Sequence, residues 1–130
     1  MSRAYRVLSL TAIATFLVSL DLSIVVVARG KIEETFGHDQ ANILAWVFSA
    51  YSIAYAAGLL TAGRFADVFG RKRAFLRGLT IFSIGSVLCG IAPSALMLVL
   101  ARVVQAIGGA QLTPASIALV LPEFPVEKRT

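Results

Sequence analysis

The chain has 130 residues and a formal net charge of +5, with 58% of its residues hydrophobic and only 15% charged. A soluble domain of this size covers its surface with polar groups, so this composition indicates an integral membrane protein. The basic residues gather between apolar stretches rather than along one face, which argues against a partner made of nucleic acid.

Four stretches are apolar enough to cross a bilayer, which takes about 20 mostly apolar residues. They are residues 7–28, 43–62, 74–92 and 95–121. For the first stretch a cleaved signal peptide is the alternative, but the apolar region is long for a signal and contains Asp21. Short links make consecutive helices antiparallel neighbours. We therefore expect an all-α integral membrane protein with four transmembrane helices and a tail at residues 122–130.

Lysine and arginine are distributed unevenly between the two sides of this predicted bundle. The side that holds both termini and the second link has nine of them, whereas the other side has two. Cytoplasmic segments carry the excess of basic residues in membrane proteins. We therefore expect a multi-pass protein of the cell membrane, embedded in the lipid bilayer, with both termini and the tail in the cytoplasm.

Two charged residues, Asp21 and Arg102, lie deep inside the apolar stretches, whereas Arg77 is near the start of its own. Each costs roughly 2.5–3.5 kcal/mol to place there, and at about 1.5 Å per residue both lie about 10 Å below the predicted outer boundary. They can therefore pair across the bundle, with Gln105 one turn from Arg102 on the same helix face. One interpretation is that the pair holds the helices together. The other is that it lines a water-accessible cavity where Asp21 changes protonation, because arginine keeps its proton.

Small residues recur at helical spacing in two of the predicted helices. Gly58 belongs to a run of small residues at every fourth position, and Gly108 and Gly109 lie in the middle of the last stretch. In lipid, helices approach closely where their side chains are small. We interpret these glycines as helix-packing positions.

The second link and its flanks read "GRFADVFGRKRAF", from Gly63 onward. Gly70 can adopt the positive φ that a tight corner requires, and Arg71 and Lys72 are placed to attract anionic headgroups. We expect Asp67 to accept hydrogen bonds from backbone N–H groups of the link or to pair with Arg71. A plain stop-transfer cluster explains the basic residues but leaves the aspartate and the glycines without a role.

This link resembles the signature loop between the second and third helices of the major facilitator superfamily. The matching positions are Gly63, Asp67, Gly70, Arg71 and Lys72. In that family the loop is similar to a latch between the two halves of the transporter.

Two further stretches extend the resemblance to about residues 20–116. "LVLARVVQAIGGAQLTPAS" is similar to the family's fourth-helix motif through Arg102, Gln105, Gly108 and Gly109. "LDLSIVVVARG" is similar to the first-helix motif of the fourteen-helix drug:proton antiporters, with Asp21 at its acidic position. The resemblance implies a proton-coupling role for the arginine, and a lipophilic or cationic small molecule as the substrate.

The resemblance also implies that the four helices are part of a six-helix N-terminal half. Alternating access is a rocking of two halves, so we expect a fragment of a proton-coupled drug or small-molecule efflux antiporter that is inactive without the missing remainder. Two alternatives stay open. One is a non-transporting membrane subunit or modulator that packs against another membrane protein. The other is a small four-helix multidrug exporter that acts as a dimer.

Enzyme chemistry has no visible basis in the sequence. His38 stands alone in the first link without other ligands at metal-binding spacing, and no glycine-rich phosphate loop is present. Cys89 lies in an apolar stretch, cannot form an internal disulfide, and is interpreted as a small packing residue. The sequence therefore predicts no enzyme activity, no metal and no cofactor.

Overall fold

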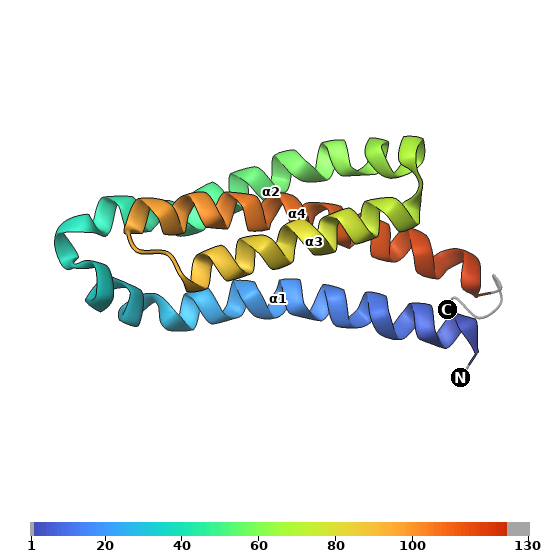
Figure 1. The fold of residues 1–130 in the computed structure, drawn as a ribbon, viewed down its shortest axis with the longest axis horizontal. Helices are drawn as coiled ribbons and strands as arrows, with labels where there is room; N and C mark the ends of the chain where they lie inside the picture. Colours follow the sequence, from blue (N-terminus) through green and yellow to red (C-terminus); the bar gives the residue numbers. More distant parts are fainter. Residues whose placement is uncertain (1, 125–130) are drawn as a thin grey trace.

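The computed structural model describes residues 2–124, which form four long helices joined by short corners (Figure 1). The long helices are α1 (Arg3–Phe36), α2 (Ala41–Phe69), α3 (Arg71–Gly90) and α4 (Ala95–Val120), and two short 3-10 helices are η1 (His38–Gln40) and η2 (Leu121–Glu123). Within the described range, all four long helices have the length and hydropathy of membrane spans. The expected all-α membrane fold is thereby confirmed.

Three helices extend beyond the apolar stretches that predicted them. α1 runs through the polar residues after position 28, where Arg29 pairs with Glu33 at 2.9 Å and Lys31 with Glu34 at 3.2 Å. Such pairs at i,i+4 and i,i+3 support a helix in water. The first link is accordingly reduced to the corner at residues 37–40, and α2 and α3 likewise continue almost to Gly70.

The predicted tail at residues 122–130 is described only in part. Residues 121–123 form η2, in which Glu123 pairs with Arg3 at 3.3 Å and thus connects the last described turn to the start of α1. Residues 125–130, including Lys128 and Arg129 of the predicted cytoplasmic tail, lie outside the described residues.

Two glycines make the sharp corners at the ends of α1 and α2. Gly37 has φ +91° and Gly70 has φ +94°, and both also have similar ψ values, 147° and 144°. Side chains with a Cβ rarely adopt this backbone conformation. The N–H of each glycine bonds to the carbonyl four residues earlier, Glu33 and Ala66 respectively, which closes the last helical turn. Gly70 therefore has the positive φ that the sequence predicted.

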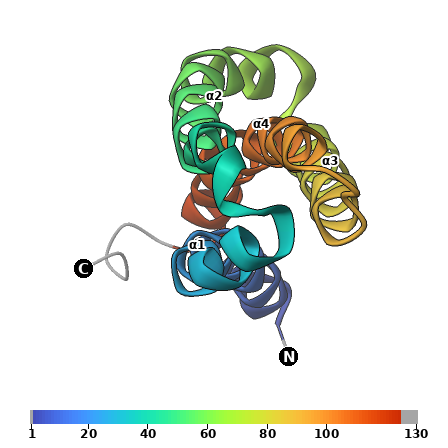
Figure 2. The ribbon, with the colours of Figure 1, turned by 90° about the vertical axis from the view of Figure 1, so that its left-hand side faces the viewer.

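Helix α4 forms the centre of the bundle. It lies between α2 and α3, and α1 packs along it from the remaining side (Figure 2). Close approach depends on glycine: a Cβ on Gly85 of α3 would lie 2.6 Å from the backbone nitrogen of Gln105, and a Cβ on Gly108 of α4 would clash with the backbone of Phe82. On the other side a Cβ on Gly58 would lie 2.8 Å from the Cβ of Ala110. The glycines interpreted as packing residues lie at helix contacts.

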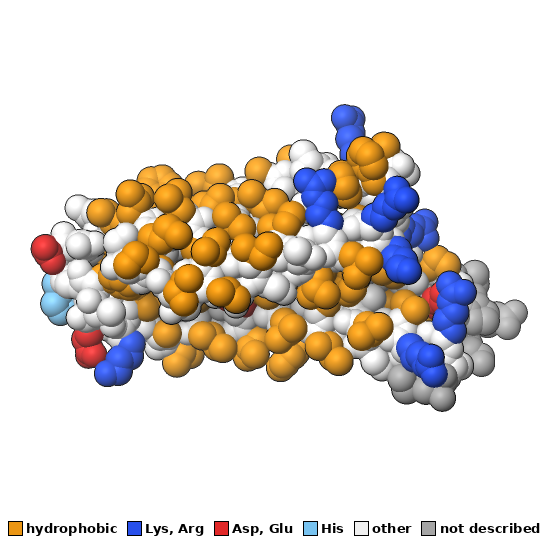
Figure 3. All heavy atoms as spheres, in the orientation of Figure 1, with side chains coloured by type: hydrophobic (Ala, Val, Ile, Leu, Met, Phe, Trp, Pro, Cys, Tyr) orange, Lys and Arg blue, Asp and Glu red, His pale blue; other side chains and the backbone are white. Residues whose placement is uncertain are grey.

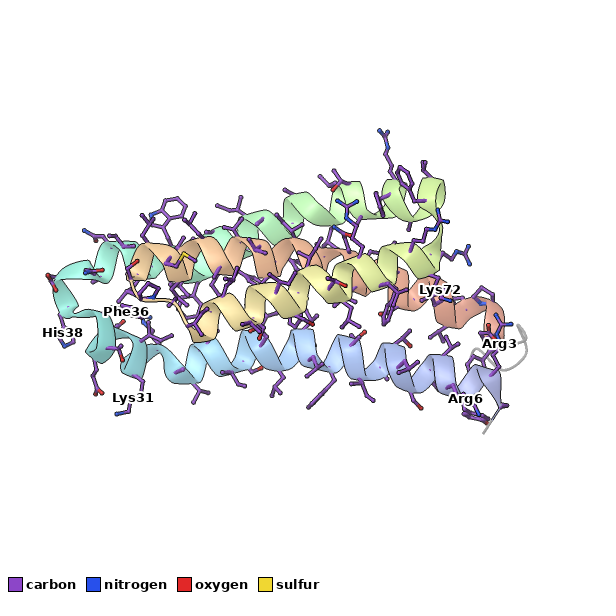
Figure 4. The ribbon with its side chains drawn as sticks, in the orientation of Figure 1. Arg3, Arg6, Lys31, Phe36, His38 and Lys72 are labelled. Carbon is purple, nitrogen blue, oxygen red and sulfur yellow. The ribbon has the colours of Figure 1, made fainter. Side chains whose placement is uncertain are left out.

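On the surface, charged side chains gather at the two ends of the bundle and leave the middle apolar (Figure 3). Figure 3 shows a broad band of hydrophobic side chains, with most of the visible Lys and Arg side chains at one end. We call this the basic end; Arg3, Arg6 and Lys72 lie there, and Lys31 and His38 lie at the opposite end (Figure 4). This arrangement has the form of a bilayer-crossing bundle.

Candidate functional site: a buried charge network

The two charges inside the apolar stretches meet between α1 and α4. Nη1 of Arg102 donates hydrogen bonds to Oδ2 of Asp21 at 2.5 Å and to Oε1 of Gln105 at 2.8 Å. Nε2 of Gln105 donates to the other carboxylate oxygen of Asp21 at 2.9 Å, which closes a three-residue ring. The side chain of Arg102 is 2% exposed and that of Asp21 is 17% exposed. The pairing that the matched depths allowed is present.

Helical spacing and one glycine position this network. Arg102 and Gln105 are three residues apart and so project from the same face of α4. Gly85 lets the backbone of α3 lie directly against Gln105, where any larger residue would clash. Asp21 approaches from the middle of α1. The network is therefore fixed by three helices, although its charges come from two.

Two further side chains complete the surroundings of the network. The ring of Tyr51, from α2, lies over the guanidinium of Arg102, with Cζ 4.0 Å from the ring centroid. Sγ of Cys89, from α3, lies 3.5 Å from Oε1 of Gln105 and donates a weak hydrogen bond to it. Each of the four helices thus contributes at least one side chain to the site.

The sequence analysis did not identify Tyr51 or Cys89 as site residues. An aromatic side chain or a thiol in an apolar stretch is most simply a packing residue, so neither stands out as a charge does. One signal was available for Tyr51. It forms an i,i+4 pair with Tyr55, which places two hydroxyl groups on one face of an otherwise apolar segment.

A cavity of about 390 Å³ lies beside the network and extends from it toward the opposite end of the bundle. Its polar wall includes Asp21, Arg102 and Gln105, and its apolar wall includes Val25 and Leu98. The arrangement brings a carboxylate to the edge of a space that a water or a small solute can enter. The site thus presents to this cavity a carboxylate that is already paired with a guanidinium.

No metal chemistry is indicated by the described part of the chain, where no three His, Cys, Asp or Glu residues form a group that could hold an ion. His38 lies at the opposite end (Figure 4).

The signature link lies at the basic end of the bundle. The contacts of its residues Arg71 and Asp67 differ from those predicted. Arg71 does not pair with Asp67; its Nη1 donates to the backbone carbonyl of Ala118, near the end of α4, at 2.9 Å. The side chain of Asp67 is exposed and makes no hydrogen bond or ion pair within residues 2–124, and the N–H of Gly70 bonds to Ala66 instead. The prediction that Asp67 bonds to backbone N–H groups of the link or pairs with Arg71 is therefore wrong.

The other two link residues have simple surroundings. Lys72 is exposed at the basic end. Gly63 lies inside α2, and a Cβ at this position would meet nothing within 4 Å. The link is tied to the bundle through the hydrogen bond of Arg71 and through Ala66, Ala74 and Phe75, which belong to a buried hydrophobic cluster.

Comparison with known proteins assigns this arrangement to a family. The family model described as Major Facilitator Superfamily matches residues 11–130. Among curated proteins, the chain is 38% identical over 118 residues to the Multidrug resistance protein B homolog of Mycobacterium tuberculosis (strain CDC 1551 / Oshkosh), covering 91% of this chain and 22% of the relative.

Two other relatives show the same pattern. Multidrug resistance protein 3 of Bacillus subtilis (strain 168) is 41% identical over 111 residues, which cover 85% of this chain and 21% of the relative. The Cephamycin export protein CmcT of Amycolatopsis lactamdurans is 37% identical over 123 residues, which cover 95% of this chain and 25% of the relative. The chain thus spans about a fifth to a quarter of the length of these relatives. No solved structure matches.

Proposed function

This chain belongs to the major facilitator superfamily of membrane transporters, and from that membership we propose that its four helices serve in a proton-coupled efflux antiporter for lipophilic or cationic small molecules. Because the chain spans only about a fifth of its relatives, the proposed activity belongs to these helices together with the rest of such a transporter. Asp21 carries the exchanged proton, and Arg102 and Gln105 hold the Asp21 carboxylate in place.

The observation that carries the proposal is the buried ring of Asp21, Arg102 and Gln105 beside a cavity. A carboxylate in this position is expensive in lipid, and such residues mark proton relays or substrate paths in membrane proteins. A purely structural clamp would be served as well by apolar packing, which often replaces a buried ion pair without loss of stability. The names of the relatives, which refer to multidrug resistance and to cephamycin export, support a drug or small molecule as cargo.

Within this function, Asp21 exchanges its ion pair with Arg102 for a proton. In the charged state Asp21 accepts hydrogen bonds from both Arg102 and Gln105. When it takes up a proton, one of these bonds weakens and the carboxyl group is released toward the cavity. A cationic substrate and a proton would then compete for the same carboxylate, which is the coupling that an antiporter requires.

The signature link supplies a second part of the proposal. Asp67 is exposed and unpartnered within residues 2–124, while Arg71 ties the link to the end of α4. We assign Asp67 the family role of a latch that meets the partner half of the transporter. The helices of one half cannot rock by themselves, so the chain alone in liposomes should show no substrate-driven proton flux.

A hybrid transporter tests the proposal. Residues of this chain replace the matching segment of the Bacillus subtilis relative, with which it shares 41% identity, and dye uptake into inverted membrane vesicles is measured under an imposed pH gradient. The hybrid should accumulate a lipophilic cationic dye, and Asp21→Asn should reduce uptake to that of vesicles without the hybrid. The matched control is Asp39→Asn, the same chemical change in η1 at the opposite end.

Two results would contradict the proposal. One is a hybrid that inserts into the membrane but moves no dye. The other is a hybrid in which Asp21→Asn retains gradient-driven uptake as fully as Asp39→Asn. Flux from the isolated chain in liposomes would contradict the requirement for a partner half.

A further inference from the structure

Uptake of a proton by Asp21 leaves Arg102 without its counter-ion. The guanidinium is 2% exposed, and within residues 2–124 the only ion pair it makes is with Asp21. Removing one partner of a buried pair is strongly unfavourable, because an uncompensated charge stays in a medium of low polarity. A proton carrier of this design therefore needs another group that stabilises Arg102 while Asp21 is neutral.

Tyr51 is placed to be that group. Its ring lies against the guanidinium, with Cζ 4.0 Å from the ring centroid, and the residue is 2% exposed. The face of an aromatic ring carries negative electrostatic potential and attracts a cation, most strongly when water is excluded. The contact does not involve Asp21, so it persists when the carboxylate is protonated.

The ring, rather than the hydroxyl group, is the part of Tyr51 that the site uses. The hydroxyl oxygen is buried and has no hydrogen-bond partner within residues 2–124, which is unusual for a tyrosine in a protein interior. The ring of Tyr55, one turn along α2, lies nearly parallel to it at a centroid distance of 5.9 Å and an angle of 11°. A Cβ on Gly109 would meet both tyrosines at 3.4 Å, an ordinary contact distance, so the pair packs directly against α4 at this position.

No other neighbour offers the same support. The charged and titratable groups that face the network are Asp21 from α1, Tyr51 and Tyr55 from α2, Cys89 from α3 and Arg102 itself from α4. The thiol of Cys89 reaches only Gln105. Gln105 accepts from Arg102 but carries no charge and is shared with Cys89.

We propose that Tyr51 is a positioning residue whose ring stabilises Arg102 when Asp21 is protonated, and so favours proton uptake at the site. This inference rests on the proposed function, because it presupposes that Asp21 changes protonation. The ring interacts more strongly with an uncompensated cation than with one whose charge a carboxylate already offsets. Loss of the ring therefore destabilises the protonated state of the site more than the ion-paired state.

Carbon-13 NMR of the chain in lipid bilayers tests this directly. The chain has three aspartates, so a sample labelled at the aspartate carboxyl carbon gives few signals, and Asp21→Asn identifies the one from Asp21. The midpoint of its pH dependence should fall by about 0.4–1.5 pH units in Tyr51→Leu, the shift that corresponds to a cation–π contact. Tyr51→Phe keeps the ring, so its midpoint should equal that of the unchanged chain.

Tyr55→Leu is the control for lost volume. It removes a ring of the same size one turn along α2, where the hydroxyl bonds to Thr113 at 2.8 Å rather than facing Arg102, and it should shift the midpoint much less than Tyr51→Leu. The role of Tyr51 is overturned if the midpoint stays the same or rises in Tyr51→Leu, or if it falls equally in Tyr55→Leu. Either result leaves the proposed function standing. An Asp21 signal without any pH dependence overturns the proposed function, and this role with it.

Discussion

Arg102 is the largest of the fully buried side chains, and its pairing with Asp21 contributes less to stability than its prominence suggests. A buried ion pair gains little more than it costs to remove both charges from water. In lipid, the free energy that holds helices together comes mainly from close van der Waals contact at small residues. Gly108 is the sharpest instance, because a Cβ there would meet the backbone of α3.

Gly108→Ala should lower the free energy of unfolding by about 1–3 kcal/mol, the usual cost of forcing extra atoms into a packed contact. Reversible unfolding in mixed detergent micelles measures this. Gly30→Ala is the matched control, since a Cβ at Gly30 in α1 would meet nothing within 4 Å. It should be neutral or slightly stabilising, by up to about 1 kcal/mol. Equal stabilities of the two variants would mean that α3 and α4 lie further apart than described.

The charge network shows what single residues can and cannot disclose in advance. Asp21, Arg102 and Gln105 are predictable because a charge in an apolar stretch is expensive and must find a partner at its own depth. Tyr51 and Cys89 are not, because their site role comes from α4 lying between α2 and α3. That arrangement is a property of the assembled bundle. The contact of Arg71 with Ala118 was missed for the same reason.

At the level of elements, the end of α4 depends on a residue from another helix. The carbonyl of Ala118 would accept a hydrogen bond from the N–H of residue 122, but that residue is proline and has none. Arg71, the first residue of α3, donates to this carbonyl instead. The signature link thereby anchors the last turn of α4, as well as joining α2 to α3.

Arg71→Ala should loosen the last turn of α4. Loss of one hydrogen bond to a charged donor corresponds to about 1.5–3 kcal/mol, so amide hydrogen exchange at Ala118 and Val120 should accelerate roughly tenfold or more. Arg73→Ala is the control, an exposed basic residue of the same helix turn that makes no contact of this kind within the described range. Equal exchange rates in the two variants would show that α4 ends without help from the link.

Helix ends were the least predictable feature of the elements. Hydropathy predicts the part of a helix that lies in lipid, and the structure places a helix at each of the four predicted spans. It does not predict where the helix stops, because α1 continues through charged residues that pair along its own surface. One corner was more predictable: a tight turn that needs a positive φ favours glycine, and Gly70 has φ +94°, whereas the corner at Gly37 was not predicted.

Across the whole molecule, the distribution of basic residues predicts how the bundle is oriented. Arg3, Arg6 and Lys72 lie at one end, and the opposite end has Lys31 beside acidic neighbours (Figure 4). Basic residues resist translocation and remain on the cytoplasmic side. The basic end is therefore expected to face the cytoplasm.

Cysteine labelling measures this orientation. In a Cys89→Ser background, which is free of other cysteines, Lys72→Cys should react with a membrane-impermeant maleimide only after the cells are opened. His38→Cys, which lies in η1 at the opposite end (Figure 4), should react in intact cells. The reverse pattern would invert the topology and place the signature link outside the cell.

The central position of α4 has a consequence for synthesis on the ribosome. Because α4 contacts each of the other three helices while α1 and α2 barely touch one another, the first three helices enter the bilayer before their shared contact surface exists. Until α4 has been synthesised, Asp21 lacks its partner Arg102. The span α1, with an unpaired carboxylate, is then a poor substrate for the insertion machinery. The nascent protein therefore passes through a vulnerable interval in which it depends on the translocon or an insertase to shelter that carboxylate.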